Sequence, residues 1–308
     1  MTFTLYDDAR LGLARDSLTG LSVGDALGAQ YFVPGRPAAP TGDGTAGLPD
    51  PVWEWTDDSE MAFSVFRMLA SRGAIDRDEL AMSFAERCEP YRGYGPGAVT
   101  ILRLIGSGTP WPIAASTAFD GEGSCGNGAA MRVAPLGAYF ADSAPHAAAQ
   151  AIAASEVTHA HPEGIAGAVA VAVAASLAAK GRLSGHRAAP REFIEVVAGA
   201  LDAAGQVRRG LERALTLLGR PPGEAAYELG NGSAATAQDT VPFTIWLAAT
   251  FLDDYPAAIR ACVAAGGDMD TTAAIVGGIV AAHTGVGTAG GVPERWVAAR
   301  EPLPSWVG

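Results

Sequence analysis

Apolar residues recur at helical spacing along most of the chain, and no stretch alternates in the manner of a half-buried β-strand. Helices are predicted over residues 10–31, 59–71, 76–87, 98–105, 146–160, 163–180, 190–219, 241–265 (as one or two helices) and 271–284. Alanine and glycine dominate the presumed helix faces, and the first helix carries a closely packed glycine face. The pattern predicts one compact all-α domain that spans residues 1–308.

Segments rich in glycine, proline, serine and threonine interrupt these helices. Loops are predicted at residues 34–51, 121–137 and 220–240, and a proline-rich tail from Val292 ends the chain. A loop as long as 34–51 within a compact domain is usually functional or disordered. Its glycines match a dinucleotide fingerprint only formally, because no predicted strand precedes them and no predicted helix follows.

The second glycine-rich loop, 121–137, runs into an apolar segment. Small residues with free backbone N–H groups before a helix are able to hold a phosphate. On spacing alone, a plain tight turn is the more common meaning of such a loop. Both interpretations stay open at this point.

Composition and charge narrow the class of protein. The 308 residues are 49% hydrophobic and 18% charged, which is typical of soluble globular proteins. The net charge of −12 and the pI near 4.8 argue against nucleic acid or an anionic membrane as the main partner. The longest apolar run, 164–179, is shorter than the ~20 residues that cross a bilayer. We interpret it as a buried core helix.

The N-terminus and the cysteines indicate the compartment. Residues 1–15 carry Asp7 and Asp8 and lack the apolar core of a secretory signal. The three cysteines form no CxxC pair and are odd in number, so neither a disulfide framework nor a zinc knuckle is indicated. We expect a reduced, cytoplasmic protein without a membrane segment.

Two clusters of carboxylates and hydroxyls stand far apart in the chain, each directly before an apolar helical run. They are Thr56-Asp57-Asp58 and Asp268-Met269-Asp270-Thr271. Together they offer only oxygen ligands, which suit hard cations such as Mg²⁺, Ca²⁺ or Mn²⁺. No lysine lies in or beside either cluster. If the fold joins them, more than one divalent ion is the simplest way to tolerate the negative charge.

Each cluster also matches the start of a helix. Asp57 with Glu60 resembles a capping box, and Asp270 or Thr271 would cap a helix that starts near Ala273. Taken singly, a cap is the more common meaning of such a motif. Two clusters in one chain shift the balance towards metal, and a helix N-terminus is itself a good place to fix oxygen ligands.

Two histidines, His159 and His161, separate the alanine-rich helices 146–160 and 163–180. Both have nitrogen atoms that bind metals. No third histidine or cysteine lies nearby to complete a zinc site. We therefore favour a role in hydrogen bonding or in substrate contact.

Five short motifs carry a resemblance to a known family. They are Gly24-Asp25-Ala26-Leu27-Gly28, Trp55-Thr56-Asp57-Asp58-Ser59, Gly126-Asn127-Gly128-Ala129-Ala130-Met131-Arg132, Thr158-His159 and Gly267-Asp268-Met269-Asp270-Thr271. They occur in the order seen in the ADP-ribosylglycohydrolase family, which includes the dinitrogenase-reductase-activating glycohydrolases and the ADP-ribosyl-acceptor hydrolases. Each motif alone would be weak, but the ordered set is specific and spans roughly residues 10–285.

The resemblance implies an orthogonal all-α bundle with two Mg²⁺ ions, or Mn²⁺, in a cleft. The implied metal ligands are Thr56, Asp57, Asp58, Asp268, Asp270 and Thr271. In the family the metals hold the distal ribose of ADP-ribose and position its anomeric carbon for attack by water. Asp58, and after it Asp57, would be the general base.

The implied substrate contacts come from the 121–137 loop and from one histidine. Ser124, Cys125, Gly126, Asn127 and Gly128 would lie along the diphosphate and its ribose, with Met131 and His159 close to the substrate. The expected partner is ADP-ribose or an ADP-ribosylated protein, bound by a monomer.

One position departs from the family pattern. Many members carry a glutamate shortly after the first motif, where this chain has Gln30-Tyr31-Phe32, and the next acid is Asp43. The leading hypothesis is a metal-dependent hydrolase that removes ADP-ribose from an acceptor, with arginine-type linkages favoured over serine-type ones. The alternatives are a non-catalytic ADP-ribose-binding protein and a two-metal hydrolase of another nucleotide-ribose glycoside.

Overall fold

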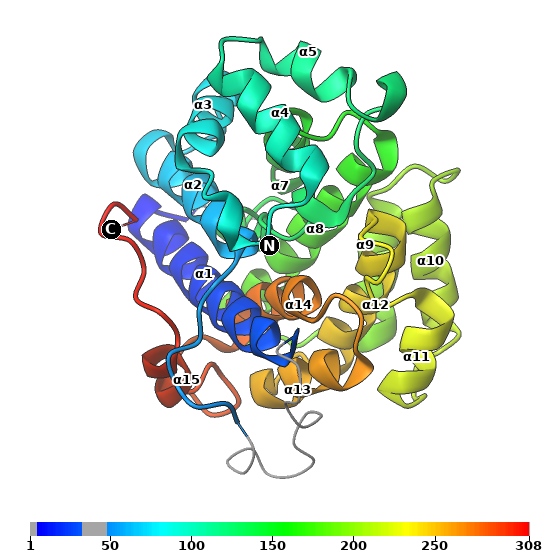
Figure 1. Cartoon of the computed structure of the whole chain (residues 1–308). Helices are drawn as coiled ribbons and strands as arrows, with labels where there is room; N and C mark the ends of the chain where they lie inside the picture. Colours follow the sequence, from blue (N-terminus) through cyan, green and yellow to red (C-terminus); the bar gives the residue numbers. More distant parts are fainter. Residues whose placement is uncertain (1–4, 33–47, 308) are drawn as a thin grey trace.

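The computed structural model describes residues 5–32 and 48–307, and their regular structure is helical (Figure 1). The α-helices are α1 Asp7–Ala29, α2 Asp57–Arg72, α3 Arg77–Arg87, α4 Pro96–Gly106, α5 Trp111–Ser116, α6 Ala134–Tyr139, α7 Ala144–Glu156, α8 Pro162–Ser184, α9 Pro190–Gly199, α10 Gln206–Leu215, α11 Pro222–Leu229, α12 Ala237–Thr250, α13 Tyr255–Ala265, α14 Met269–Thr284 and α15 Glu294–Ala299. The 3₁₀ turns are η1 Gln30–Phe32, η2 Pro90–Arg92, η3 Phe119–Gly121 and η4 Asn127–Ala129. Within the described residues, extended segments pair only through isolated bridges. The all-α prediction is confirmed.

Helices α1 and α14 pack along each other at the centre of the bundle (Figure 1). Gly20, Gly24 and Gly28 recur every four residues on the face of α1 that meets α14. A Cβ atom at Gly24 would lie 2.2 Å from the carbonyl oxygen of Ala273, and one at Gly28 would lie 2.4 Å from that of Met269. Glycine is what permits this approach of two helix backbones. The predicted glycine face therefore places the C-terminal end of α1, at Gly28, against the first turn of α14.

Helix α8 is the buried core helix that the apolar run at 164–179 predicts. It packs against α6, α7, α12 and α14. Length and composition alone would allow it to cross a membrane, yet 72% of its most apolar window is buried inside the bundle. Its apolar surface is thus covered by neighbouring helices.

Several predicted boundaries are wrong, and a proline in the first turn explains why α11 was missed. The predicted helix at 190–219 is two helices, α9 and α10, and the predicted loop at 220–240 contains α11 and the start of α12. Proline occupies the first turn of α9 and of α11. At that position its missing N–H has no helical partner to lose and its fixed φ is favourable, so it starts a helix. The proline-rich tail likewise contains α15.

The predicted 34–51 loop lies outside the described residues except for residues 48–51, which are not helical. The remaining long loop, 121–137, contains the short turn η4 and the start of α6. The apolar segment that follows it is thus helical in part.

Candidate active site

The two acidic clusters meet in space. Asp57 and Asp58 lie in the first turn of α2, while Asp270 and Thr271 lie in the first turn of α14. The hydroxyl of Thr271 is 3.4 Å from Oδ2 of Asp58, a contact across 213 positions of sequence. Because α1 holds the start of α14 so closely, a third carboxylate, Asp25, joins them. One oxygen each from Asp25, Asp58 and Asp270 lie within 4.8 Å of one another.

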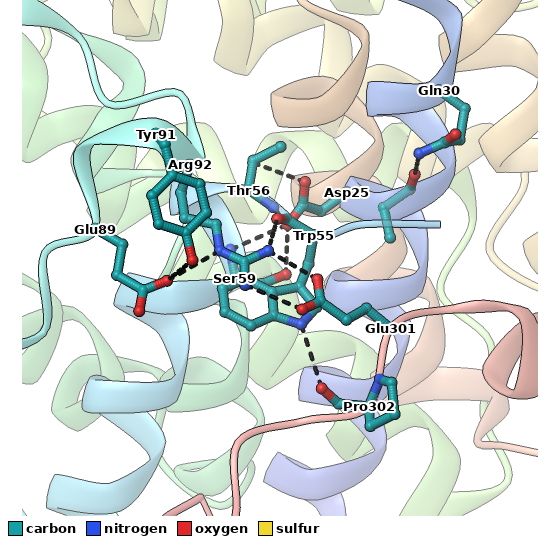
Figure 2. Close-up of polar contacts among 11 residues, drawn as sticks. Asp25, Gln30, Trp55, Thr56, Ser59, Glu89, Tyr91, Arg92, Glu301 and Pro302 are labelled. Carbon is teal, nitrogen blue, oxygen red and sulfur yellow. Dashed lines mark hydrogen bonds and ion pairs between the residues drawn. The ribbon is translucent and has the colours of Figure 1, made fainter. Parts of the chain in front are cut away.

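Asp25 belongs to this site, although the sequence analysis did not predict it as a site residue. Its carboxylate is fully buried and accepts four hydrogen bonds, from the backbone N–H and the hydroxyl of both Thr56 and Ser59 (Figure 2). The Thr56 hydroxyl lies 2.7 Å from Oδ1 of Asp25. Three of these bonds go to Oδ2 and one goes to Oδ1, so Oδ1 keeps a lone pair. Asp25 therefore fixes the start of α2 and belongs to the triad of carboxylates that could hold a metal ion.

These hydrogen bonds leave an excess of acceptors around Asp58. The Thr56 hydroxyl has a single proton, and Asp25 receives it at the shorter distance. Thr56 Oγ1 and Asp58 Oδ2 then face each other as two acceptors 3.1 Å apart. The other oxygen of Asp58, Oδ1, is buried and has no hydrogen-bond partner in the described part of the chain. An arrangement of this kind needs a cation or extra protons to be stable.

The electrostatics lead to the same conclusion. Burial, and then the neighbouring carboxylates, raise the pKa of Asp58 and of Asp270 well above the usual aspartate value. Burial and the charge of Asp25 raise the pKa of Asp57 to about 7. None of these carboxylates forms an ion pair with a described lysine, arginine or histidine. The all-oxygen donor set, with its unpartnered atom, therefore fits a hard divalent cation.

The acidic cluster opens into a cleft of about 750 Å³. The predicted site residues that line it are Asp57, Asp58, Ser124, Cys125, Gly126, Asn127, Gly128, Met131, His159, Asp268, Asp270 and Thr271. Of the predicted site residues, Thr56 is the exception, because it lies behind Asp58 against Asp25. The cleft wall also includes residues that the sequence prediction did not assign to the site: Gly93, 95–98, Phe119, 122–123 and 234–236.

One side chain connects the glycine-rich loop to the acidic cluster. Asn127 Nδ2 donates a hydrogen bond of 2.7 Å to Oδ2 of Asp268 and another of 3.0 Å to the hydroxyl of Thr240. Its backbone N–H donates to the carbonyl of Ala235. The loop at 124–128 and the acidic end of the cleft are therefore held in one fixed arrangement.

Known proteins share this arrangement of sequence and fold. Residues 7–307 match the model of the ADP-ribosylglycohydrolase family. The chain belongs to that family. Its membership, together with the names of its relatives, makes it an enzyme that hydrolyses glycosyl bonds.

Two relatives of this ADP-ribosylglycohydrolase and one solved structure illustrate the similarity. ADP-ribosylhydrolase ARH3 of Homo sapiens is 29% identical over 332 residues, covering 92% of this chain and 87% of the human protein. ADP-ribosyl-[dinitrogen reductase] glycohydrolase of Rhodospirillum rubrum is 33% identical over 175 residues, covering 53% of this chain and 55% of its own. A solved ADP-ribosylglycohydrolase-related protein complex superposes with a TM-score of 0.64 at 29% identity, covering 96% of this chain and 94% of its own.

The helix-cap interpretation of the clusters is wrong in its details. Thr56, not Asp57, is the N-cap of α2, where its hydroxyl accepts from the N–H of Asp58. Glu60 does not complete a capping box, because its carboxylate accepts from Glu89 N and from the hydroxyl of Tyr94. Helix α14 begins at Met269 rather than near Ala273.

The N-cap of α14, Asp268, makes no capping hydrogen bond with its side chain. Its carboxylate instead accepts the amide of Asn127 at the cleft. Asp268 in this ADP-ribosylglycohydrolase is thus held by a contact across the cleft wall and not by its own helix.

The two candidate histidines have different environments in this ADP-ribosylglycohydrolase. His161 is the N-cap of α8 and accepts a hydrogen bond from Glu163 N, so it has a structural role at the start of this helix. His159 is buried beside the glycines of the 124–128 loop. Burial, and then the charge of Arg132, lower the pKa of His159 to about 3, so the imidazole is neutral at physiological pH.

The position that departs from the family pattern lies at the end of α1. Gln30 begins η1, and its side-chain amide donates back to the carbonyl of Ala26 (Figure 2). No carboxylate occurs from Ala26 to Phe32, and Asp43 lies outside the described residues. Gln30 itself carries no group that could act as a general acid.

Proposed function

We propose that this enzyme is a metal-dependent hydrolase that cleaves the glycosidic bond between ADP-ribose and an acceptor. The observation that carries the proposal is the unpartnered Oδ1 of Asp58, buried within a cluster of carboxylates in the wall of a cleft. Such an atom needs a cation, and its position gives that cation access to a ligand in the cleft. Two ions, Mg²⁺ or Mn²⁺, suit this number of carboxylates.

Six residues would hold the metal: Thr56, Asp57, Asp58, Asp268, Asp270 and Thr271. Asp25 would support them, since its four hydrogen bonds turn the lone pairs of the Thr56 hydroxyl towards Asp58. When bound, the metal would supply a water of lowered pKa and stabilise developing negative charge. Asp58 and Asp57 reach the cleft from the start of α2 and are the candidates to accept the proton of the attacking water.

The remaining wall would hold the nucleotide. Beyond the carboxylates the cleft is lined by apolar side chains that include Met61, Ile101, Phe119 and Met131, which suit a flat, weakly polar base. The N–H groups of Gly126 and Asn127 already donate to Ser124 Oγ and to the carbonyl of Ala235. The diphosphate would therefore depend on other donors of the same wall, of which His159 is one.

For the acceptor we propose an arginine-type linkage. A serine oxygen leaves as a strongly basic alkoxide unless an acid protonates it. A guanidinium already carries its proton at neutral pH and leaves as neutral guanidine. The absence of a carboxylate from Ala26 to Phe32 therefore favours the guanidinium leaving group.

The test is release of free ADP-ribose from arginine-linked and serine-linked ADP-ribosyl peptides, with Mg²⁺, with Mn²⁺ and with EDTA. We expect release from the arginine-linked peptide, loss of release in EDTA and recovery on return of metal. Release from the serine-linked peptide alone would contradict the acceptor assignment. ADP-ribose binding without any release would favour a binding protein, and absence of binding would favour another glycoside.

A further inference from the structure

Arg132, which follows the 124–128 loop, is an unusual cation in the cleft wall. It is 1% exposed, and it is the one lysine or arginine among the described residues that line the cleft. It forms no ion pair with a described carboxylate, and its Nε has no hydrogen-bond partner there. A buried cation without an ion pair costs folding free energy, so its presence calls for an explanation.

The contacts of Arg132 show where its charge acts. Its Nη2 donates 2.8 Å hydrogen bonds to the carbonyl of Ala154 and to the hydroxyl of Thr158. Its guanidinium lies 4.5 Å from the ring centroid of Phe84, and its Nη1 faces the sulfur of Met61. The Ala154 carbonyl, Phe84 and Met61 have no exchangeable proton, so Thr158 is the contact of Arg132 that can pass a hydrogen bond on to another group.

The protons on this chain of contacts can be assigned. The guanidinium only donates, so Thr158 Oγ1 is the acceptor from Arg132. Thr158 Oγ1 also lies 2.8 Å from Nδ1 of His159, and Thr158 is 1% exposed. Its hydroxyl proton therefore has His159 Nδ1 as its acceptor. The reverse assignment would bury that proton without an acceptor, at a free-energy cost.

The other ring nitrogen of His159 faces the glycine-rich loop. A Cβ atom at Gly126 would lie 3.5 Å from His159 Nε2, and one at Gly128 would lie 3.4 Å from it. Glycine at both positions keeps side chains away from this edge of the ring. His159 also lines the cleft. Nε2 is thus the nitrogen with access to a ligand.

We infer that Arg132 is a positioning residue that acts through Thr158 to hold His159 as its Nε2–H tautomer. His159 then presents a hydrogen-bond donor, and not an acceptor, to the cleft. The matching ligand group is an oxygen acceptor, such as a phosphate or ribose oxygen. The identity of that ligand rests on the proposed function, but the tautomer is a property of the free protein.

The test begins with ¹⁵N NMR of the imidazole nitrogens in the free wild-type protein, with His159→Gln to assign the signal. We expect a protonated Nε2 and an unprotonated Nδ1 from pH 6 to pH 8. An Nδ1–H tautomer would overturn the inference. This measurement needs no substrate, and the variant serves only to assign the signal.

Two variants then test the route through Thr158. Thr158→Val keeps the shape but removes the hydroxyl, while Thr158→Ser keeps the hydroxyl and is the matched control. We expect Thr158→Val to show mixed tautomers and about tenfold weaker ADP-ribose binding, and Thr158→Ser to match wild type. Thermal unfolding checks that both variants fold, and Thr158→Ala replaces Thr158→Val if it does not.

The outcomes separate this inference from the proposed function. Equal tautomers and equal affinities in Thr158→Val and Thr158→Ser would overturn the relay. The Nε2–H tautomer in a protein that does not bind ADP-ribose would support the relay while contradicting the proposed ligand.

Discussion

Two neighbouring concave regions of this protein handle buried charge in opposite ways. The acidic cluster at the cleft gathers aspartates from α1, α2 and α14, and no lysine, arginine or histidine in the described part of the chain forms an ion pair with them. A smaller pocket of about 430 Å³ is lined by Trp55 and Arg92. It lies close to the cleft in sequence, because Asp57, two residues after Trp55, and Gly93, directly after Arg92, line the cleft. In that pocket Arg92 forms ion pairs with Glu89 and Glu301.

Arg92 is the centre of the paired region (Figure 2). Its two Nη atoms donate to the two oxygens of Glu301 at 2.7 and 3.0 Å, and its Nε donates to Glu89 at 3.3 Å. The guanidinium also lies 3.4 Å from the ring centroid of Trp55. This network ties the C-terminal segment to the turn that precedes Gly93.

The two regions show how structural and functional charge differ. Both regions contain carboxylates at helix or turn starts, and composition does not distinguish them. Where a guanidinium of the chain forms a bidentate ion pair with the carboxylate, the pair offsets the desolvation cost of the buried charge and stabilises the fold. Where the compensation is missing, as around Asp58, the carboxylates are suited to a charge that comes from outside the chain.

The largest effect is expected from Asp58→Asn. The change removes one of the carboxylates best placed to bind metal, so ADP-ribose release should fall at least about 100-fold. In EDTA, the same variant should be more stable than wild type by on the order of 1 kcal/mol, because it removes a buried like-charge contact. Peptide assays and urea unfolding measure the two effects.

The exposed Asp50→Asn is the matched control for Asp58→Asn and should change neither quantity. Saturating Mg²⁺ should raise the unfolding free energy of wild type, by about 2.7 kcal/mol at 100 times Kd, but much less that of Asp58→Asn. Full activity of a folded Asp58→Asn protein would remove the basis for the metal site.

Much of the fold follows from local patterns in the sequence. Helical periodicity predicts α1 to α4, α7, α8, α12, α13 and α14, because each buries an apolar face at a spacing visible in one window of residues. The periodicity fails at α11, whose Pro222 and Gly223 are typical of loops but here occupy a first turn.

The site is only partly predictable for a physical reason. The acidic clusters are recognisable because their ligands are adjacent in sequence. Asp25 is a single acid within a helix, and its partners Thr56 and Ser59 are 31 and 34 positions away. Arg132 stood in a recognised motif, but its missing ion pair becomes apparent only when its neighbours are known. A role that depends on the lack of an ion-pair partner in the folded protein cannot be recognised from neighbouring residues in the sequence.

A smaller and opposite effect is expected from Arg92→Met in the paired region. The change leaves Glu301 without its bidentate partner and removes the stacking on Trp55, so the unfolding free energy should fall by about 1–3 kcal/mol. Activity should fall less than in Asp58→Asn, because Arg92 does not line the cleft. Urea unfolding and the peptide assay measure both.

The double variant Arg92→Met with Glu301→Gln separates charge from packing. It should recover part of the lost stability, since no carboxylate is then left unpaired. A destabilised Asp58→Asn together with a stabilised Arg92→Met would reverse the comparison and show that the assignment of the two regions is wrong.

The smallest effect is expected from Glu89→Gln, at the exposed edge of the same network. The Glu89 side chain is 47% exposed, whereas that of Arg92 is 11% exposed, so water screens their ion pair. The change should cost no more than about 0.5 kcal/mol, and the difference from wild type should vanish in about 1 M NaCl. The N–H of Glu89 still donates to Glu60 in this variant, so the turn keeps its backbone anchor. A loss as large as that of Arg92→Met would mean that Glu89, and not Glu301, provides the compensating charge of the paired region.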